Sequence, residues 1–513
     1  MNNKQNSSFM NSTFWTSSVI VFLAVLWGAI NPGSLANAAN TAYEFMTNSF
    51  GWFYLLSVLF IVIFLFVLAV SKYGKIRLGK DDEKPDYPFY TWIGMLFSCG
   101  FGAGLVFWGI AEPMNHFVDS PLPVEGKTPE SARVAMQYSF FNWGVHQWSV
   151  FTIVGLALAY FQFRKGKSGE ISTILKPLTV KKGIHKAINI LAVIATVMGV
   201  ATSLGMGILQ INGGLDYVFS ISQNNVNLMI ITALLLVMYL TSAVTGLDKG
   251  IKWLSTLNLS LALGLIIIVL ILGPTRFILD GLVLGIGDYI QHFFGMSLGI
   301  SPYDNGMWTK EWTVAYWAWV IAWSPFVGAF IARISKGRTI REFIFGVLIV
   351  PPFIAIVWIG VFGGTAIHMD LFQNANIAAA VQTDVTSALF ATFEHFPMST
   401  LLSLIFIVLI VTFLVTSADS AAFILGMMTS KGNLNPSMVV KVIWGVLMAA
   451  IVVVLIKSSG LQGLQTASLV TALPFTVILL LITYSLIKTI KEDHRPNITA
   501  ESIPEFVRKR KAQ

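Results

Sequence analysis

The sequence predicts an all-α, polytopic membrane protein with twelve transmembrane helices. Hydrophobic residues make up 55% of the 513 residues and charged residues only 11%, whereas soluble domains contain about 25% charged residues. Windows of ~20 apolar residues, the length needed to cross a bilayer, recur along the whole chain. Lys and Arg gather in alternate connections between these windows, which is typical of a chain that crosses the membrane repeatedly.

The twelve apolar windows define the expected spans. Their approximate cores are 14–30, 51–70, 89–111, 138–163, 188–211, 228–246, 254–273, 312–332, 343–364, 399–427, 438–456 and 466–487. The shorter apolar segment 281–297 is interpreted as a helix lying at the membrane interface. The N-terminus has no charged n-region and no small-residue cleavage site, so we expect the first span to be retained rather than removed as a signal peptide.

The distribution of positive charge predicts the orientation. If the N-terminus is cytoplasmic, the inward segments carry 28 of the 33 Lys and Arg residues, and the outward segments carry the other five. The positive-inside rule then places both termini in the cytoplasm. Because topology accounts for the net charge of +8, this charge does not indicate nucleic-acid binding.

Several function classes lack their sequence signals. The single cysteine, Cys99, excludes a disulfide framework and a multi-cysteine metal site. The seven histidines are scattered, with no His-x-x-x-His spacing or nucleophile–base pair. Gly166-Lys167-Ser168 lacks the upstream glycine of a phosphate loop, and no pore loop is repeated. We therefore expect neither an enzyme, nor an ATP-driven pump, nor an ion channel, and no cofactor.

Two expected spans contain helix-breaking residues. Span three contains Gly100, Gly102 and Gly104, and each glycine weakens a helix by about 1 kcal/mol relative to alanine. Span eight contains Pro325 within Ser324–Gly328, and proline removes a helical hydrogen bond. Open backbone at membrane depth is tolerated only where protein or a wet cavity surrounds it. Both spans are therefore predicted to break around a bound solute, as in a transporter; the alternative is that the small residues only permit close helix packing.

The spacing of the two interruptions predicts an internal repeat. They lie five spans apart and their spans run in opposite directions, as in inverted-repeat transporters. The expected units are 1–88, the cytoplasmic N-terminus and two extra helices; 89–273, the first five-helix repeat; 274–311, an external connection; 312–487, the second repeat; and 488–513, a basic cytoplasmic tail.

Aromatic residues gather in the spans next to the predicted breaks. Trp usually marks the membrane interface, but the clusters in spans four and eight lie within their spans. Trp319 and Trp323 share one helix face because they are four residues apart. Aromatic cages bind quaternary ammonium groups by cation–π attraction, although ordinary core packing would explain any single member. The clusters consist of Trp143, Trp148, Phe151, Trp317, Trp319 and Trp323.

Few ionisable residues lie deep in the spans. The candidates are Glu112, His146 and Asp419. An ionisable residue within a membrane span is a functional hypothesis by default, but Glu112 and Asp419 could also pair locally near helix breaks. Their scarcity fits a solute that carries its own charge, with the opened amides of Gly100–Gly104 available to its anionic end.

Several motifs together resemble the betaine/choline/carnitine transporter family. They are Gly100–Leu105 followed by Phe107-Trp108-Gly109 and Glu112-Pro113; Tyr316–Trp319 continued by Trp323–Gly328; Ala332–Glu342; and Thr416–Ser420. The resemblance runs from span one to span twelve and is greatest to bacterial glycine betaine transporters. It implies a homotrimer of LeuT-like protomers with alternating access in the bacterial cell membrane.

The resemblance also implies site residues. Trp143, Trp148, Phe151, Trp319 and Trp323 match an aromatic box, with Gly100, Phe101, Gly102, Ala103 and Gly104 lining the solute site and Trp317 and Pro325 in supporting positions. A coupling sodium ion would bind the carbonyls of Ser98, Phe101 and Phe413 and the hydroxyls of Thr416 and Ser417. A second sodium site would use Thr196 and Phe326. The chain departs from the family pattern at three positions, Phe151 in place of tyrosine, Val320 in place of tryptophan and Val200 in place of threonine.

The expected function is sodium-coupled import of glycine betaine or a related quaternary ammonium solute for osmoprotection. The rival is choline or carnitine/γ-butyrobetaine transport with proton coupling or exchange. Thr416 and Ser417 favour sodium coupling, because the family's exchangers lack this hydroxyl pair; without the resemblance, the alternative is that these hydroxyls only bond back to the preceding helical turn. Ala103 and Gly104 stand where the choline carriers tend to have an acidic residue. The terminal cluster Arg508–Lys511 would attract anionic lipid, either as an osmotic sensor or as a simple positive-inside anchor.

Overall fold

The computed structural model describes residues 10–494 apart from Phe101, Val180, 246–249, 304–305 and Leu434. Over this part of the chain the regular structure is helical, and the β-type pairing is one isolated antiparallel bridge between Arg77 and Thr339. The predicted all-α class is confirmed. The predictions that concern Phe101 and the tail after residue 494 lie outside the described residues.

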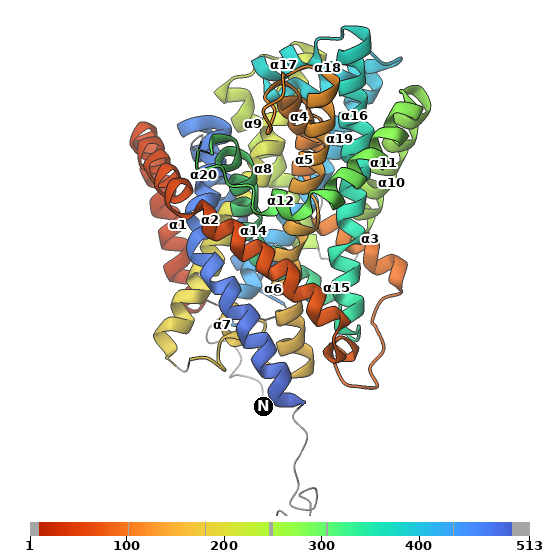
Figure 1. Ribbon diagram of the computed structural model, residues 1–513. Coiled ribbons are helices and arrows are strands. Elements are labelled where there is room, and N and C mark those ends of the chain that lie inside the picture. The colour runs from red at the N-terminus through yellow and green to blue at the C-terminus, as the bar shows by residue number, and fades with distance from the viewer. Residues whose placement is uncertain are drawn as a thin grey trace, which may run out of the picture.

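The helices form one bundle, with α17 and α18 at one end and α7 at the other (Figure 1). In chain order, with 3₁₀ and π-helices written η, they are α1 (Ser12–Ile30), α2 (Pro32–Val70), η1 (Lys72–Lys75), α3 (Phe89–Gly100), α4 (Ala103–Val118), α5 (Pro129–Asn142), α6 (Val145–Ala159), η2 (Tyr160–Arg164), α7 (Ile171–Ile174), α8 (Lys182–Phe219), α9 (Asn225–Thr245), α10 (Gly250–Leu272), α11 (Thr275–Gln291), α12 (Phe293–Ser297), α13 (Met307–Thr309), η3 (Lys310–Val314), α14 (Ala315–Ile334), α15 (Ile340–Leu348), α16 (Val350–Gln373), α17 (Ile377–Thr383), η4 (Val385–Ser387), α18 (Ala388–Glu394), α19 (Ser399–Met428) and α20 (Met438–Asp493).

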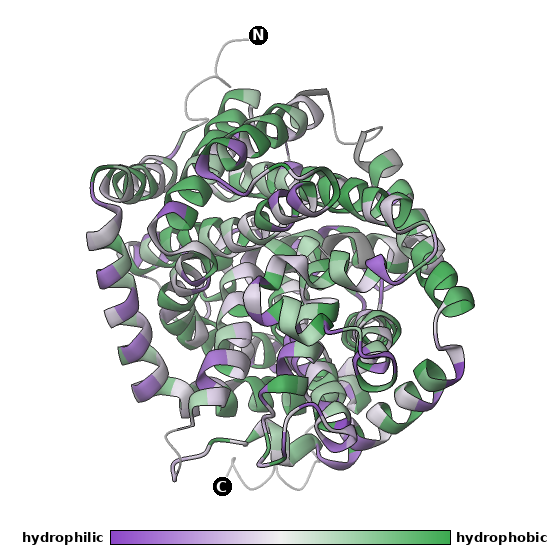
Figure 2. Ribbon diagram, turned by 90° about the horizontal axis from the view of Figure 1, so that it is seen from above, coloured by the Kyte–Doolittle hydropathy of each residue, from purple (hydrophilic) through white to green (hydrophobic). Residues whose placement is uncertain are grey.

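Ten helical stretches among the described residues are long and apolar enough to cross a membrane. Two features account for the difference from the twelve predicted spans. The third predicted span is divided between α3 and α4, which are 12 and 16 residues long. The last two predicted spans are two helical segments that follow each other within the 56 residues of α20 and are separated by a kink, where Ser459 and Gly460 leave the helical conformation. Seen from above, apolar segments lie along much of the rim of the bundle, and hydrophilic turns reach the rim at its left and lower edges (Figure 2). The count of twelve stays a prediction.

The predicted break in span three is present. Helix α3 ends at Gly100 and α4 begins at Ala103, with Gly102 extended at φ −99° and ψ −164°. Among the residues that the structure describes, no side chain caps the start of α4. The first amides of α4 therefore point out of a helix N-terminus without a side-chain acceptor, where the helix dipole favours a negative charge.

The predicted break in span eight is wrong. Helix α14 continues through Pro325 without interruption. Proline cannot donate the backbone hydrogen bond that the carbonyl of Ile321 would accept, but the Ser324 hydroxyl donates to this oxygen at 2.7 Å. A serine side chain therefore satisfies the carbonyl that the proline leaves free, as occurs in other transmembrane helices.

Span four contains a break that the sequence analysis did not predict. Helix α5 ends at Asn142 and α6 begins at Val145, so Trp143 and Gly144 connect the two helices. A Cβ atom on Gly144 would lie 2.5 Å from the Tyr289 hydroxyl, which accepts a hydrogen bond from the amide of Val145 at 3.0 Å. Glycine is thus required where α11 approaches the opened backbone.

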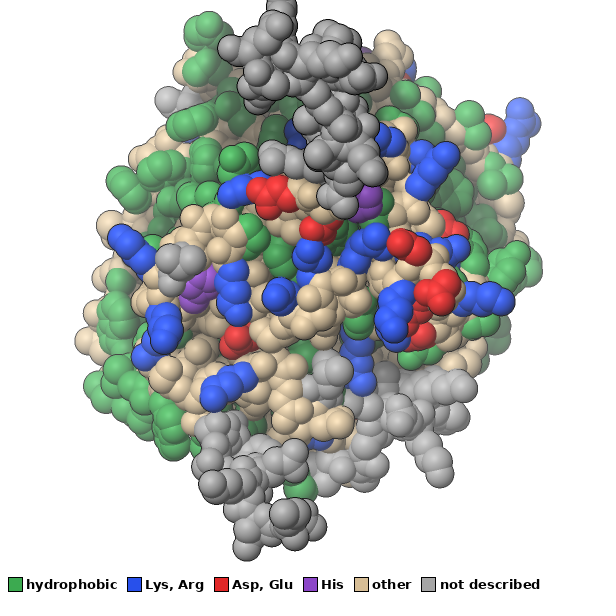
Figure 3. Space-filling view, turned by 90° about the horizontal axis from the view of Figure 1, so that it is seen from below, with side chains coloured by type: hydrophobic (Ala, Val, Ile, Leu, Met, Phe, Trp, Pro, Cys, Tyr) green, Lys and Arg blue, Asp and Glu red, His purple; other side chains and the backbone are tan. Residues whose placement is uncertain are grey.

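Two paired loops connect the end of α14 to the segment that precedes α3. Residues 76–78 and 337–340 exchange three backbone hydrogen bonds of 2.8 Å, among them Leu78 N–H to Arg338 O. The Arg338 guanidinium is buried and lies 4.1 Å from the ring centroid of Trp92 at the start of α3. This end of the molecule carries many Lys and Arg side chains (Figure 3), as the topology prediction requires of a cytoplasmic face. The side of the membrane stays a prediction.

The described part of the connection 274–311 is largely helical, and its placement outside the cell stays a prediction. The expected interfacial helix 281–297 corresponds to the end of α11 and all of α12, separated at His292. Helix α11 begins earlier than expected, at Thr275, directly after Pro274. Its contact surface with α5 is held by Arg133, whose Nε and Nη2 atoms each donate to the Asp288 carboxylate at 2.7 Å.

Candidate substrate and ion site

The five predicted box residues form one connected aromatic cluster. Trp319 and Trp323 stack with their centroids 5.8 Å apart and their planes 10° apart, as expected for residues on one helix face. Phe151 meets Trp323 edge-on at 5.7 Å, and Trp148 meets Phe151 edge-on at 5.5 Å. Trp143 contacts Trp319 at 6.1 Å. All five side chains are 4% exposed or less, so the box is screened from water.

Close helix contacts hold the box in place. A Cβ atom on Gly328 would lie 2.5 Å from Val154, so α14 can approach α6 only with glycine there. A Cβ atom on Gly199 of α8 would lie 2.7 Å from the backbone nitrogen of Trp323. The Trp319 indole donates to the Gly199 carbonyl at 3.3 Å. Helices α6, α8 and α14 thus fix the stacked pair from two sides.

The glycine break lies against this box. A Cβ atom on Gly104 would be 2.6 Å from Trp319 Cη2. At Gly102 the nearest atoms to an added Cβ are the Ser417 hydroxyl at 3.6 Å and Trp323 Cη2 at 3.9 Å. The opened backbone of span three therefore meets both the aromatic box and a predicted sodium ligand. Gly100 ends α3, and Ala103 is buried at the start of α4.

The predicted sodium ligands of α19 lie together. Thr416 Oγ1 lies 3.0 Å from the carbonyl oxygen of Thr412 and 3.0 Å from that of Phe413, and donates a hydrogen bond to them. The Thr416 hydroxyl is therefore adjacent to the predicted Phe413 carbonyl. Ser417 Oγ is buried and has no hydrogen-bond partner among the described residues. These oxygen atoms are of the kind that a hard cation prefers. Of the other predicted ligands, Ser98 lies in the last turns of α3 and Phe101 lies outside the described residues.

Asn258 of α10 is a polar partner that the sequence analysis missed. Its Nδ2 atom donates to Thr416 Oγ1 at 3.3 Å, while its Oδ1 atom is buried without a partner among the described residues. A single amide in the apolar stretch 254–273 was the available signal.

The predicted second sodium site is less complete. The Thr196 hydroxyl donates to the carbonyl of Ala192 at 2.8 Å, and Val200 one turn later is buried and has no oxygen to offer. Phe326 packs against Trp323 at 6.1 Å. Its ring is therefore a neighbour of one box residue, and no sodium ligand of this second site is added by it.

Glu112 is a fully buried carboxylate that holds one box residue. It accepts from Trp143 Nε1 at 2.7 Å and from Asn142 Nδ2 at 2.9 Å, and it lies 3.3 Å from His116 Nε2. Glu112 therefore pairs near a helix break, as expected. This break is the one in span four, between α5 and α6. Through this carboxylate, α4 positions the connection between α5 and α6.

The remaining predicted polar residues pair outside the box. His146 Nε2 lies 2.7 Å from Ser297 Oγ, and its ring stacks on Trp317 at a centroid distance of 5.3 Å. Trp317 therefore packs on His146 rather than on the stacked pair of the box. Asp419 accepts from Ser242 Oγ at 2.5 Å. Val320, the departure next to Trp319, is fully buried.

Comparison with known proteins identifies the family of the chain. The family model described as "BCCT, betaine/carnitine/choline family transporter" matches residues 12–495. The chain belongs to this family. It is 55% identical to an ectoine/hydroxyectoine transporter of Virgibacillus pantothenticus, over 95% of this chain and 98% of the relative. It is 46% identical to the glycine betaine transporter OpuD of Bacillus subtilis, over 96% and 97% of the two chains, and 42% identical to a probable glycine betaine transporter of Desulfitobacterium hafniense, over 94% and 98%.

Membership of the BCCT family makes the protein a membrane transporter and not an enzyme. It confirms the resemblance carried by the motifs of spans three, eight and ten. The relatives named above differ in their solutes, betaine in some and ectoine or hydroxyectoine in another. The match shows a transporter of the betaine/carnitine/choline family, and the solute that this chain carries requires a separate argument.

Proposed function

We propose that this protein is a sodium-coupled importer of a zwitterionic compatible solute, with glycine betaine as the first candidate. The observation that carries the proposal is the position of Gly102, beside the Ser417 hydroxyl on one side and the Trp323 ring on the other. A solute at the opened backbone would touch the box, and a sodium ion at the hydroxyls would touch the same backbone.

The two ends of a betaine match two features of this place. A trimethylammonium group over a desolvated indole gains about 2 kcal/mol from cation–π attraction. The carboxylate would lie at the uncapped start of α4, where Ala103 and Gly104 present backbone amides at a helix N-terminus. Discontinuous helices bind anionic substrate groups in this way in other transporters.

A second candidate is ectoine or hydroxyectoine, favoured by the relative of 55% identity. The cyclic amidinium of ectoine is a planar cation, which also suits the face of an indole. Phe151 presents no hydroxyl to either solute. The alternatives that keep the family and change the coupling are proton-driven choline uptake and carnitine/γ-butyrobetaine exchange.

The test is uptake of labelled glycine betaine into proteoliposomes, with an inward sodium gradient or an equal potassium gradient. We expect accumulation with sodium only, and competition by ectoine but not by choline or carnitine. Uptake at the same rate with potassium would reject sodium coupling, and stronger inhibition by ectoine than by unlabelled betaine would make ectoine the solute.

Matched variants test the box itself. Trp323→Leu should weaken solute binding about 30-fold, which corresponds to about 2 kcal/mol. Trp317→Leu removes an indole from the same helix but outside the box, so it should leave the affinity within about threefold of the parent. Equal effects of the two substitutions would contradict the proposed cage.

The remaining features are proposed with this function. A homotrimer in the bacterial cell membrane with both termini cytoplasmic fits the family resemblance and the charge distribution. Osmotic activation through the basic tail Arg508–Lys511 and anionic lipid would fit a compatible-solute importer. Deletion of residues 508–513 should then reduce the response of uptake to hyperosmotic stress, and an unchanged response would dismiss the cluster.

A further inference from the structure

His116 of α4 is a fully buried histidine that the proposed solute and ion sites do not use. Its Nε2 atom lies 3.3 Å from Glu112 Oε1, one helical turn earlier. An ionised carboxylate only accepts hydrogen bonds, so Nε2 carries the hydrogen of this contact. The Nδ1 atom is buried and has no hydrogen-bond partner among the described residues. The neutral ring therefore keeps one free lone pair, which can take up a proton.

The surroundings of this ring can stabilise a positive charge on it. The ring centroid of His116 lies 4.4 Å from that of Trp312 and 4.9 Å from that of Trp308. Both distances are within the ~6 Å at which an indole attracts a cation, and the adjacent carboxylate supplies the opposite charge. Trp308 also lines a cavity of about 550 Å³, whose wall includes Met307, 58% exposed. Water in this cavity would come within one indole ring of His116.

Two tyrosines are titratable groups that face this histidine–glutamate pair. Tyr316 of α14 interacts with the carboxylate, and Tyr138 of α5 contacts one of the two indoles. On η3, Lys310 and Glu311 lie toward Tyr43 of α2, which donates to the Lys310 carbonyl at 3.3 Å and interacts with the Glu311 carboxylate.

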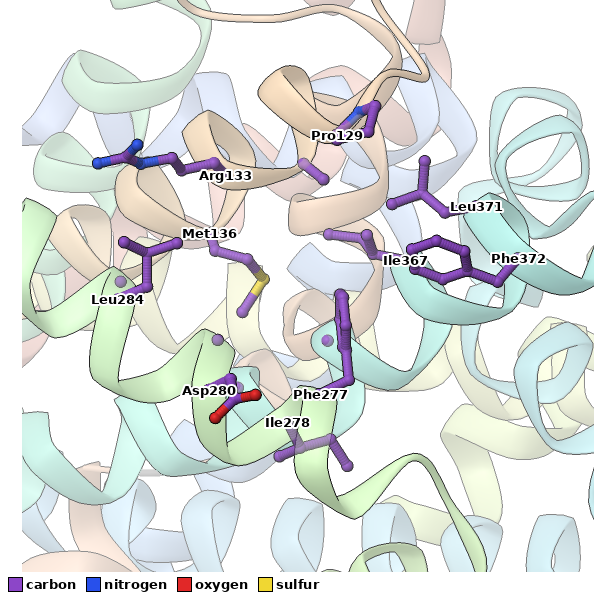
Figure 4. Close-up of a pocket in the computed structure, with 15 residues that line it drawn as sticks. Pro129, Arg133, Met136, Phe277, Ile278, Asp280, Leu284, Ile367, Leu371 and Phe372 are labelled. Atoms are coloured by element: carbon purple, nitrogen blue, oxygen red, sulfur yellow. The ribbon is translucent and has the colours of Figure 1, made fainter.

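Charged and titratable groups on the other helices packed on α4 have partners of their own. On α5, Arg133 extends away from Phe372 of α16 (Figure 4) and pairs with Asp288. The carboxylates of the remaining neighbours, α8 and α16 to α19, accept hydrogen bonds elsewhere, namely Asp216 and Asp384 from Gln223, Asp370 from the amides of Ile377 and Ala378, Glu394 from Tyr217 and Asp419 from Ser242, while the ring of His368 packs on Phe277. Among the described residues, Glu112 is the carboxylate that contacts His116.

We propose that His116 is a proton-binding residue that controls solute affinity through Glu112. The inference rests on the proposed binding of a cationic headgroup in the aromatic box. Glu112 accepts from Trp143 Nε1 at 2.7 Å, and a hydrogen bond from an indole to a carboxylate makes the ring richer in electrons. A proton on His116 compensates the charge of this carboxylate, so it weakens the attraction of Trp143 and of Glu112 for a cation in the box. Solute affinity therefore falls when His116 takes up a proton, and by linkage the solute expels this proton.

The same contacts reach two irregular segments that carry box residues. Asn142, at the break in span four, donates to Glu112 and accepts from Thr313 Oγ1 at 3.3 Å. Thr313 and Trp312 belong to η3, a π-helical turn that leads directly into α14, and such turns are frequent at functional sites. A change of charge at His116 is thus passed to the connection that holds Trp143 and to the start of the helix that holds the stacked indoles.

The test is the pH dependence of glycine betaine binding, measured by isothermal titration between pH 5 and 8, where histidine ordinarily changes its charge. The sodium concentration is fixed, and the solute keeps its own charges over this range. His116→Gln can still donate to Glu112 but cannot take up a proton. His292→Gln is the matched control, because His292 lines the same cavity and its Nδ1 atom lies 3.0 Å from the Asp288 carbonyl, away from the pair.

We expect the affinity of the parent protein and of His292→Gln to fall about fivefold from the upper to the lower end of this range. Binding should release part of a proton, seen as a heat that depends on the ionisation enthalpy of the buffer. His116→Gln should show a flat profile and no release. Equal profiles in the three proteins, or binding to the parent without proton release, would overturn the proposal.

A second readout needs neither solute nor a substituted histidine. In protein with ¹⁵N-labelled tryptophan, the indole N–H signal of Trp143, identified by its loss in Trp143→Phe, should move with pH because the charge beside its acceptor changes. A signal that stays fixed over the same pH range would overturn the proposal even if His116→Gln does not fold. If glycine betaine binds at no pH, the proposed function fails, whereas this signal still decides whether Glu112 responds to a proton on His116.

Discussion

Gly104→Ala is the sharpest test of how closely the opened backbone approaches the box. The added methyl carbon would lie 2.6 Å from Trp319 Cη2, about 0.8 Å short of the 3.4 Å at which ordinary contacts begin. Trp319 cannot simply move away, because it stacks on Trp323 and donates to the Gly199 carbonyl. Overpacking of this kind costs about 1–3 kcal/mol, and a displaced Trp319 carries this cost into solute binding as a loss of about 5- to 150-fold in affinity.

The assay is solute binding by isothermal titration, with the melting temperature recorded for each variant. Gly102→Ala is the near control, because its Cβ would meet neighbours only at 3.6 Å and beyond, which is ordinary contact. Gly94→Ala in α3 is the far control, because an added Cβ has nothing within 4 Å there. The substitution at Gly104 should weaken binding more than either control. An affinity for Gly104→Ala equal to that of Gly94→Ala would refute the contact argument.

Three further outcomes follow from other contacts. Glu112→Gln leaves the Trp143 or Asn142 donor without its carboxylate acceptor, so thermal unfolding should show a loss of about 1–3 kcal/mol and titration a weaker solute affinity. Ser324→Ala removes the hydroxyl that satisfies the carbonyl freed by proline, and we expect a similar loss of about 1–3 kcal/mol in unfolding, restored by Ser324→Thr. Lys336 donates to Glu83 and holds the pKa of this carboxyl below its ordinary value of 4.5. The loop stabilisation is therefore complete above pH 4.5 and is lost as the pH falls through the lower folded value. The protection of residues 76–85 against hydrogen exchange, corrected for the intrinsic exchange rate at each pH, should therefore fall on acidification in the parent but not in Glu83→Gln.

The fold class and the aromatic clusters could be predicted because both depend on local pattern, whereas the choice of five box residues from these clusters came from the family resemblance. Apolar length identifies membrane helices, and a spacing of four places Trp319 and Trp323 on one face whatever surrounds them. The break at Gly100–Gly104 was also local, because glycine both weakens the helix and allows the close approach to Trp319 that an alanine would block.

The errors came from partners distant in the sequence or of unexpected chemistry. Proline at 325 predicted a break, but a serine hydroxyl one residue earlier satisfies the free carbonyl. The break at Trp143–Gly144 depends on Glu112 and Tyr289, which come from α4 and α11. Asn258 meets Thr416 across 158 positions of sequence. A single sequence gives no signal for such pairs beyond the residue types themselves.

Coupling between ion and solute is the final expectation, and it depends on the position of Gly102 between Ser417 and Trp323. If sodium at the α19 hydroxyls fixes this backbone, it lowers the cost of placing a solute beside it. Linkage requires the solute to raise sodium affinity by the same factor, typically 5- to 150-fold. Solute binding measured with and without sodium, and sodium binding with and without solute, should give one common factor above unity.

A double substitution separates the ion site from the solute site in this coupling. Thr416→Ala with Ser417→Ala should bring the factor close to one while leaving the sodium-free solute affinity unchanged, because the box residues are untouched. A fall in sodium-free affinity would place the hydroxyls in the solute site instead. A coupling factor of one in the parent protein would mean that sodium does not change the solute affinity through the backbone at Gly102. The sodium coupling in the proposed function would then be rejected, whereas binding of the solute by the aromatic cage would not.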